Sequence, residues 1–331
     1  MIIAGIFGDI GVLLSDTGMW SNLIEFGIVL FLAALGEVIA EKSGVLNLGV
    51  EGMMAVGAMT GFWAGIETGS PWAAAVIAAV AVGLFAMIHG VVSVVIGADQ
   101  VVSGLALTIL GLGLAAFLGT GLVIQSAGAN FSNLSLGPLS DIPGLGPTLF
   151  SMDGMGWVAL LLGAITWFVL KRTRAGLNLR AVGESAATAD AAGTAVVATR
   201  LVAVGIGGAF AGLAGSYLTL KVTPSWNESI VGGLGWIAVA LVIFGAWKPG
   251  RVLIGALLFG GLIAVGPRFQ TRRCNSGETA DCITTEINPI VVSMLPYLLT
   301  IAVLILLSIR SRNRPSLAPA AIGRAYRREE R

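Results

Sequence analysis

Charged and reactive side chains are scarce in this sequence of 331 residues. Lys, Arg, Asp and Glu make up 11% of it, and it holds one histidine and two cysteines. Two cysteines are too few for the usual ligand sets of structural metal sites. No GxxxxGK[ST] loop is present to cradle the phosphates of ATP. We therefore expect no catalytic residues, no metal and no cofactor in this chain.

Hydrophobic residues dominate the chain, at 56%, and the mean hydropathy is +0.91. The apolar runs are repeatedly long enough for a helix to cross the hydrocarbon core of a bilayer, which is about 30 Å thick. This pattern predicts an all-α protein, a polytopic transmembrane helical bundle of about nine spans, with eight to ten as the range. Residues 44–63 could instead re-enter the bilayer. The candidate spans are 22–40, 46–63, 72–97, 101–124, 156–171, 195–220, 230–247, 252–268 and 291–309.

The positive charges indicate an orientation in the cell membrane. Most of the 19 Lys and Arg residues fall in one alternating set of connections, which includes residues 171–200 and the carboxyl-terminal residues 310–331. The positive-inside rule then places the carboxyl terminus in the cytoplasm and the amino terminus outside. We expect one membrane domain over residues 1–331, with an extracytoplasmic segment 1–21 and a basic tail 310–331 that touches membrane lipid. Nothing in the charge pattern supports nucleic-acid binding.

A polar cluster interrupts the first apolar stretches, where Glu37, Glu41, Asn47 and Glu51 lie within residues 36–57. A charged side chain at the centre of a bilayer costs about 3 kcal/mol, so such residues usually line a water-filled path or meet a partner inside the bundle. We expect Glu41 to lie in a short loop in water. For Asn47 and Glu51, a path and a packing role are both open.

Several other residues have structural interpretations. The single histidine, His89, reads as a packed or interfacial side chain, and Gly208 and Gly212 form a GxxxG pair that favours close helix contact. Tryptophans near the ends of the predicted spans read as interfacial anchors. They are Trp20, Trp72, Trp157 and Trp247.

Two connections stand out. In residues 171–194, the segment 185–192 can form two helical turns that Gly193 ends, and its small side chains suit docking into a groove of a partner. An ordinary solvated linker is the alternative. In the last outer connection, Cys274 and Cys282 are placed to form a disulfide in an oxidising exterior. The alternative is that both cysteines are free thiols.

Four motifs resemble, in order along the chain, signatures of ABC-importer permeases of the branched-chain amino acid, ribose and nucleoside type. The nearest branch looks like the nucleoside or simple-sugar permeases. The motifs are GVLNLGVEGMM at 44–54, DQVVSGLALT at 99–108, GLNLRAVGE at 176–184 and IAVALVIFGAWKP at 237–249. The sequence departs from that branch where Thr108 replaces a common Asn, Ser185-Ala186 a common Asn-Pro, and Leu234 a common Arg.

The resemblance implies a type II ABC-importer permease fold and a division of labour. The chain would be one of two membrane subunits, paired as a heterodimer, with a separate cytoplasmic ATP-binding subunit and an extracytoplasmic substrate-binding protein. The residues expected to line the translocation path are Glu37, Asn47, Glu51, Gln100, Ser103 and Thr108. Those expected to couple to the ATPase are Arg180, Gly183, Glu184, Ala187, Asp190 and Gly193.

The sequence leaves three other functions as alternatives. A branched-chain amino acid permease would keep the fold and the partners but change the cargo. A proton-coupled secondary transporter could use Glu37 or Glu51 as a proton relay. A purely structural membrane subunit would leave the ordered series of motifs unexplained.

Overall fold

The computed structural model describes residues 16–134, 137, 152–271, 291–292, 294–311 and 317–326. Within these ranges the secondary structure is helical, apart from one isolated β-bridge between Asn133 and Asp153. The predicted all-helical class is confirmed. Cys274 and Cys282 lie outside the described residues, so their disulfide stays a prediction.

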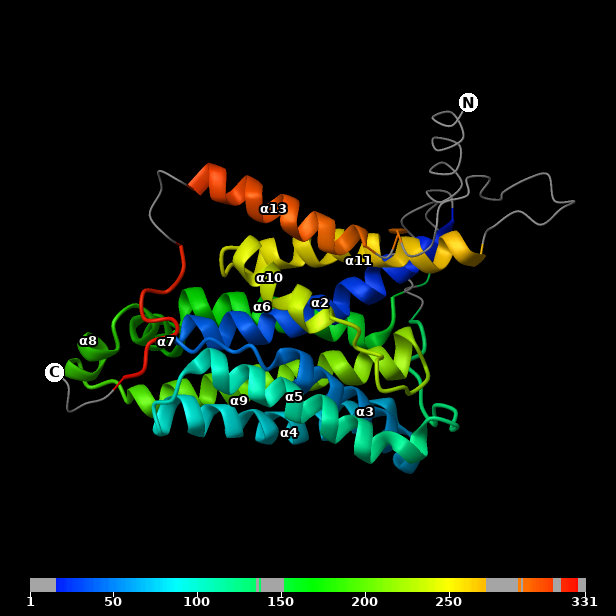
Figure 1. Ribbon diagram of the computed structural model, residues 1–331, viewed down its shortest axis with the longest axis horizontal. Helices are drawn as coiled ribbons and strands as arrows, with labels where there is room; N and C mark the ends of the chain where they lie inside the picture. Colours follow the sequence, from blue (N-terminus) through cyan, green and yellow to red (C-terminus); the bar gives the residue numbers. More distant parts are fainter. Residues whose placement is uncertain are drawn as a thin grey trace, which may run out of the picture.

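The long helices run roughly along the longest axis of the molecule (Figure 1). The long ones are α2 (Thr17–Lys42), α4 (Pro71–Gly90), α5 (Gln100–Gly119), α6 (Gly154–Arg172), α9 (Val196–Tyr217) and α11 (Pro249–Thr271). The others are α3 (Val50–Thr68), α7 (Arg174–Glu184), α8 (Ala186–Ala191), α10 (Leu234–Phe244) and α13 (Leu295–Ser311). Two π-helical turns, Val91–Val95 and Leu218–Val222, continue α4 and α9.

The predicted count of about nine spans is not confirmed. Each predicted span contains a helix, but in the described part of the chain only six helices are long and apolar enough to cross a membrane: α2, α4, α5, α6, α9 and α11. Helix α10 has 11 residues, and at 1.5 Å per residue it reaches about 16 Å, roughly half of the hydrocarbon core. A continuous apolar run therefore overstated its length, because the chain ahead of Leu234 is not helical.

Local sequence explains where several helices begin. Ser70, Asp99 and Asp153 precede α4, α5 and α6, and the side-chain oxygen of each accepts a hydrogen bond from an amide of the first turn. These bonds satisfy amides that have no partner inside the helix. Short polar residues next to apolar runs thus mark where these three helices begin.

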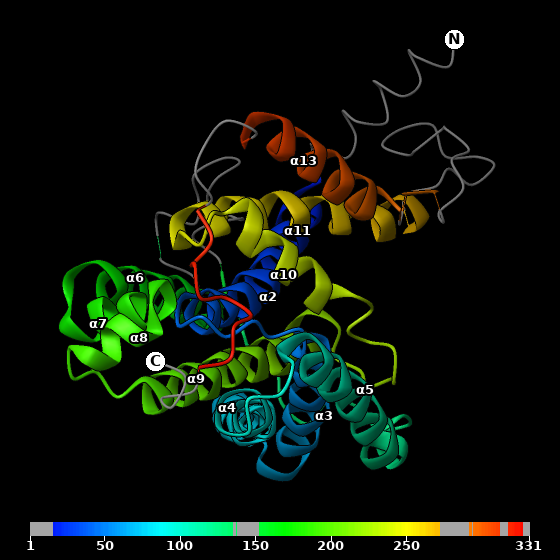
Figure 2. The ribbon, with the colours of Figure 1, turned by 60° about the vertical axis from the view of Figure 1, so that its left-hand side comes forward.

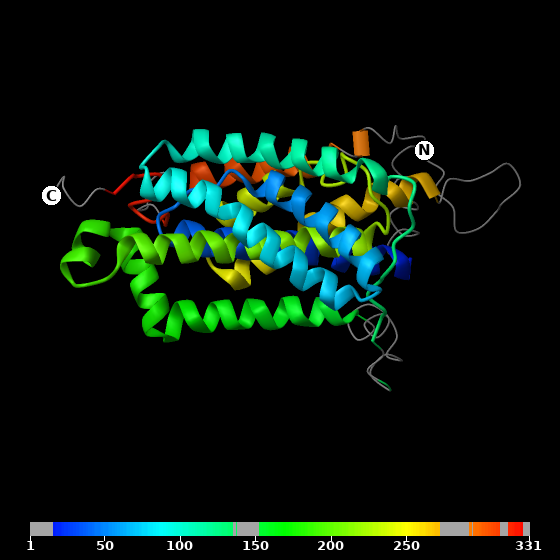
Figure 3. The ribbon, with the colours of Figure 1, turned by 90° about the horizontal axis from the view of Figure 1, so that it is seen from below.

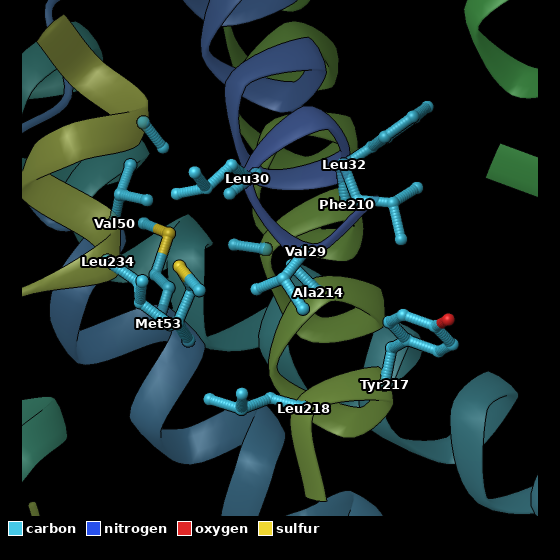
Figure 4. Packing of buried hydrophobic residues seen from close by; sticks show 14 of the residues in the cluster. Val29, Leu30, Leu32, Val50, Met53, Phe210, Ala214, Tyr217, Leu218 and Leu234 are labelled. Carbon is cyan, nitrogen blue, oxygen red and sulfur yellow. The ribbon is translucent and has the colours of Figure 1, made fainter. Parts of the chain in front are cut away.

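Helix α2 forms the centre of the bundle, with α9 on one side and α11 on the other (Figure 2). Helix α4 packs on α9, and α3 packs on both. The shared core is built from α2, α3, α9 and α10, as the packing of Leu30, Met53, Ala214 and Leu234 shows (Figure 4). The core therefore consists of apolar side chains that these helices pack against one another.

Glycine sets the distance between α4 and α9, as the GxxxG pair predicted. A Cβ atom added at Gly212 would lie 2.5 Å from the carbonyl oxygen of Ala78, and one at Gly208 would collide with the side chain of Ala86. Only a residue without a Cβ allows this approach, which maximises backbone contact where hydrophobic driving force between helices is absent. The predicted contact role of Gly208 and Gly212 is confirmed.

Candidate functional site

The chain leaves helical geometry at residues 43–49, between α2 and α3, while still inside the bundle. Ser43, Val45 and Asn47 have no exposed surface. Backbone amides and carbonyls that are neither in a helix nor in water must find other partners, since an unsatisfied group costs several kcal/mol in an apolar surrounding. This buried break therefore demands polar side chains from its neighbours.

Helices α4 and α5 supply these side chains. The amide of Leu46 donates to Oε1 of Gln100 at 2.7 Å, and Thr108 Oγ1 donates to the carbonyl oxygen of Leu48 at 2.8 Å. His89 Nε2 lies 3.1 Å from the carbonyl oxygen of Leu46, and its Nδ1 lies 3.0 Å from Ser103 Oγ. His89 is fully buried, which confirms the prediction of a packed side chain. A histidine fits this position because each of its two ring nitrogens meets a polar partner.

Asn47 connects the break to α2. Its Nδ2 donates to Oε1 of Glu37 at 2.7 Å, and its Oδ1 accepts from the amide of Gly49 at 3.0 Å. The second carboxylate oxygen of Glu37 has no hydrogen-bond partner among the described residues. Glu37 is 1% exposed, so one oxygen of a buried carboxyl group is held and the other is not.

Glu51 joins the break to a second non-helical stretch. Its two carboxylate oxygens accept from the amides of Gly233 and Gly235, both at 2.8 Å, where α10 begins. A carboxylate at this position satisfies the free amides of the first turn and complements the positive end of the helix dipole. A Cβ atom at Gly235 would lie 2.6 Å from Cα of Glu51, so glycine permits the contact.

All six residues expected to line the path thus lie at the break or beside it. Five are buried and Ser103 is half-buried. Apart from the unpaired oxygen of Glu37 and the unpaired Nε2 of Gln100, their side-chain polar groups are bonded to other protein groups. Lining of a path stays a prediction, and what the geometry establishes is that these groups hold broken backbone in place.

The expectation for Glu41 was wrong. Helix α2 continues through Lys42, and Glu41 is only 1% exposed. Its Oε2 accepts a hydrogen bond of 2.5 Å from Nε1 of Trp247. The same contact corrects the reading of Trp247 as an interfacial anchor, since its side chain is 7% exposed. Neither partner was recognisable from the sequence, because 206 positions separate them.

A second region of interest lies at the end of the bundle where α7 and α8 are found (Figure 3). The short helix predicted at 185–192 is confirmed as α8: the Ser185 side chain caps it, and Gly193 follows with a φ of 85°. Helix α7 was not predicted. Thr173 caps it, and it turns the chain sharply away from α6 (Figure 3).

The residues expected to couple to an ATPase differ in their exposure. Glu184, Ala187, Gly193 and Arg180 are exposed. Gly183 is buried, and a Cβ atom there would collide with the carbonyl oxygen of Lys42. Asp190 is half-buried and accepts a hydrogen bond of 2.9 Å from the hydroxyl of Tyr326.

Tyr326 belongs to a carboxyl-terminal strap, residues 317–326, that lies against the same end of the bundle (Figures 1 and 2, red). The amide of Ala321 donates to the carbonyl oxygen of Gly183 at 2.8 Å. Arg200, counted above among the charges of a connection, is instead inside α9 and 1% exposed. It donates to the carbonyl oxygens of Ser43 and Arg324 at 3.2 and 3.1 Å, and so ties the strap to the buried break.

Known proteins provide the comparison. Residues 19–304 match the family described as "Branched-chain amino acid transport system / permease component". The chain is 39% identical to a putative glucose ABC transporter permease protein of Haloferax volcanii, over 94% of this chain and 98% of the relative. It resembles two guanosine ABC transporter permease proteins of Bacillus subtilis, one at 35% identity over 83% of this chain and 87% of the relative. The other is 27% identical over 70% and 68%. No solved structure matches the chain.

Proposed function

The chain belongs to the permease-component family of the branched-chain amino acid transport system type, and from this premise we propose that it carries nucleosides or related simple sugars into the cell. In this proposal it forms the translocation path together with a second, different permease. The observation that supports the cargo most strongly is its similarity, over most of both chains, to permeases named for glucose and guanosine. Two different guanosine permease relatives from one organism support the heterodimer.

The path is proposed to run beside the buried break. Two non-helical stretches, 43–49 and 223–233, meet where Glu51 bonds the start of α10. Interrupted helices that meet inside a bundle are the usual setting of substrate sites in membrane transporters, because irregular backbone at this depth survives only inside protein or beside a cavity. Asn47, Glu51 and Thr108 would then border the path as well as hold its wall.

The end of the bundle that carries α7 and α8 is proposed to face the cytoplasm, with α8 as the element that docks the ATPase. Basic residues gather there, as the positive-inside rule requires of the cytoplasmic side. Ala186 and Ala189 of α8 are buried against Val182 and Val196, whereas Ala187 is exposed. A helix seated by one small apolar cluster, with small side chains outward, fits a groove in a partner.

The coupling proposal is tested by Ala187→Trp in vesicles that contain both permeases, the ATPase and the substrate-binding protein. We expect uptake and its linked ATP hydrolysis to fall sharply while membrane insertion is unchanged. Glu184→Lys should act in the same direction. The matched control is Ala320→Trp, an exposed alanine at the same end but outside α8. Equal activity of the two tryptophan variants would contradict a coupling role for α8.

The cargo is tested in the same vesicles with labelled guanosine, glucose and leucine. Uptake of guanosine or glucose that requires ATP and survives collapse of the proton gradient supports the proposal. Uptake of leucine alone would favour the branched-chain amino acid alternative. Uptake that persists without ATP but stops with the proton gradient would favour a secondary transporter.

A further inference from the structure

A basic cleft of about 430 Å³ opens at the α7–α8 end of the bundle, apart from the buried break. Its walls come from the end of α2, the α6–α7 corner, the turn before α11 and the strap residue Leu317. Five of its lining side chains are cationic: Lys42, Lys171, Arg180, Lys248 and Arg251. Segments far apart in the sequence thus bring five positive charges to one concave surface.

The charges of the cleft have little acidic compensation among the described residues. None of the five forms an ion pair with a carboxylate in the part of the chain that the structure describes. Lys42 is repelled by Arg180 and Lys248 and attracted by Glu184, the acidic residue acting on it. The carboxylate of Glu41, one position away, is buried and accepts a hydrogen bond from Trp247, which lines the cleft. A concave site with this surplus of positive charge attracts an anion.

The turn that forms one wall is held in an unusual backbone conformation. Ala246 and Trp247 have φ values of 50° and 54°, a left-handed conformation that is unfavourable for residues other than glycine. The bond from Trp247 to Glu41 keeps the turn in place. Such strain persists only where surrounding contacts over-determine it, and here the turn leads into Lys248 and Arg251, which both line the cleft.

Two of the helices that line the cleft, α6 and α11, also expose apolar side chains along their length. Helix α6, which contributes Lys171, exposes 59% of Leu161, 47% of Ile165 and 55% of Phe168. Helix α11, which contributes Arg251, exposes 68% of Ile254 and packs against α6. A cationic mouth at the end of an apolar helical surface matches the two parts of an anionic phospholipid, the phosphate in the cleft and the acyl chains along the helices.

We propose that this cleft binds the phosphate group of an anionic ligand and that its source is a phospholipid head group of the adjacent leaflet. Free phosphate shares the chemistry of the head group but not the acyl chains. Lys42 ends α2 and Arg180 lies on α7, so the bound phosphate bridges the central helix and the α7–α8 pair. This site is independent of which cargo the permease carries.

The test uses the full-length chain in a neutral detergent, with lipid binding measured by native mass spectrometry. The probes are dioleoylphosphatidylglycerol, dioleoylphosphatidylcholine and, in a separate arm, inorganic phosphate. The variant is Lys248→Gln with Arg251→Gln. Its matched control is Arg172→Gln with Arg174→Gln, which removes two exposed positive charges at the same end but outside the cleft.

We expect phosphatidylglycerol to bind more tightly than phosphatidylcholine, and the cleft variant to weaken it at least about tenfold while the control changes it little. Inorganic phosphate that competes at equal concentration and shows the same dependence on the variant would support the phosphate site but overturn the lipid source. Equal losses in both double variants would overturn the proposal, since surface charge alone would explain binding. Lipid binding that the cleft variant leaves unchanged would also overturn the proposal, because the head group would then lie elsewhere.

Discussion

The buried break at 43–49 and helix α8 are both short departures from the long helices, but they are held very differently. At the break, side chains from α4, α5 and α9 bond backbone carbonyls, and Glu37 of α2 bonds the side chain of Asn47. Helix α8 rests on a small cluster of alanines and valines and on one hydrogen bond from the strap. The break is fixed by many directional bonds, whereas α8 is fixed by few.

This difference shows what polar residues do at the two places. Inside the bundle these side chains replace the hydrogen bonds that a helix or water would supply. Removing one therefore leaves a buried backbone group without a partner. At the end of the bundle water can replace any lost bond, and the local free energy of opening is expected to be small. A rigid wall and a movable coupling element would be built this way.

The largest loss of stability is expected from Glu51→Ala. Two amides at the start of α10 lose their acceptor, which should lower the free energy of unfolding by about 2 to 4 kcal/mol. Glu51→Gln keeps one acceptor oxygen and should lose about half as much. The measurement is unfolding of the purified chain in detergent. Equal stability of wild type and Glu51→Ala would mean that the contact with α10 contributes little.

The next largest loss of stability is expected from Gly212→Ala. The added methyl group would clash with the backbone of α4, and relieving the clash would separate α4 from α9. We expect a loss of about 1 to 3 kcal/mol, seen as a lower thermal midpoint. Gly113 on α5 has open space around its Cβ position, so Gly113→Ala is the control and should be neutral or slightly stabilising. Similar losses in both would show that helix flexibility matters and not close packing.

Thr108→Val should cost about 1 kcal/mol, because the carbonyl oxygen of Leu48 loses its donor while the shape of the side chain is kept. Thr108→Ser retains the hydroxyl and should restore most of the stability. If serine is no better than valine in the same unfolding measurement, the hydrogen bond is not what holds the break.

The smallest effect is expected from Tyr326→Phe, about 0.5 kcal/mol and confined to α8. Amide hydrogen exchange of residues 186–191 should become faster, while exchange in α2 and α9 is unchanged. Tyr297→Phe removes a hydroxyl that bonds the carbonyl oxygen of Gly232 instead, and should leave α8 unaffected. Slower or unchanged exchange in α8 after Tyr326→Phe would show that the strap does not restrain it.

Short-range chemistry made much of this protein predictable. Apolar runs of about 20 residues predicted the helical class and the helix positions. The Ala-rich segment 185–192 and Gly193 predicted α8, since a left-handed stop acts on the residues beside it. The motifs around Asn47, Gln100 and Glu184 predicted the family and brought the candidate site residues to attention.

What the sequence left open are the partners of the buried polar groups. Arg200 bonds a carbonyl 157 positions away, and Glu51 bonds an amide 182 positions away. No local pattern encodes such a pair, because a side chain and a backbone group meet only after several helices have packed. The sequence by itself determined that this chain forms apolar helices and which polar residues interrupt them. The tertiary structure decided which helices are long enough to span, where the backbone breaks, and which side chain satisfies each broken bond, since burial makes every unsatisfied group costly.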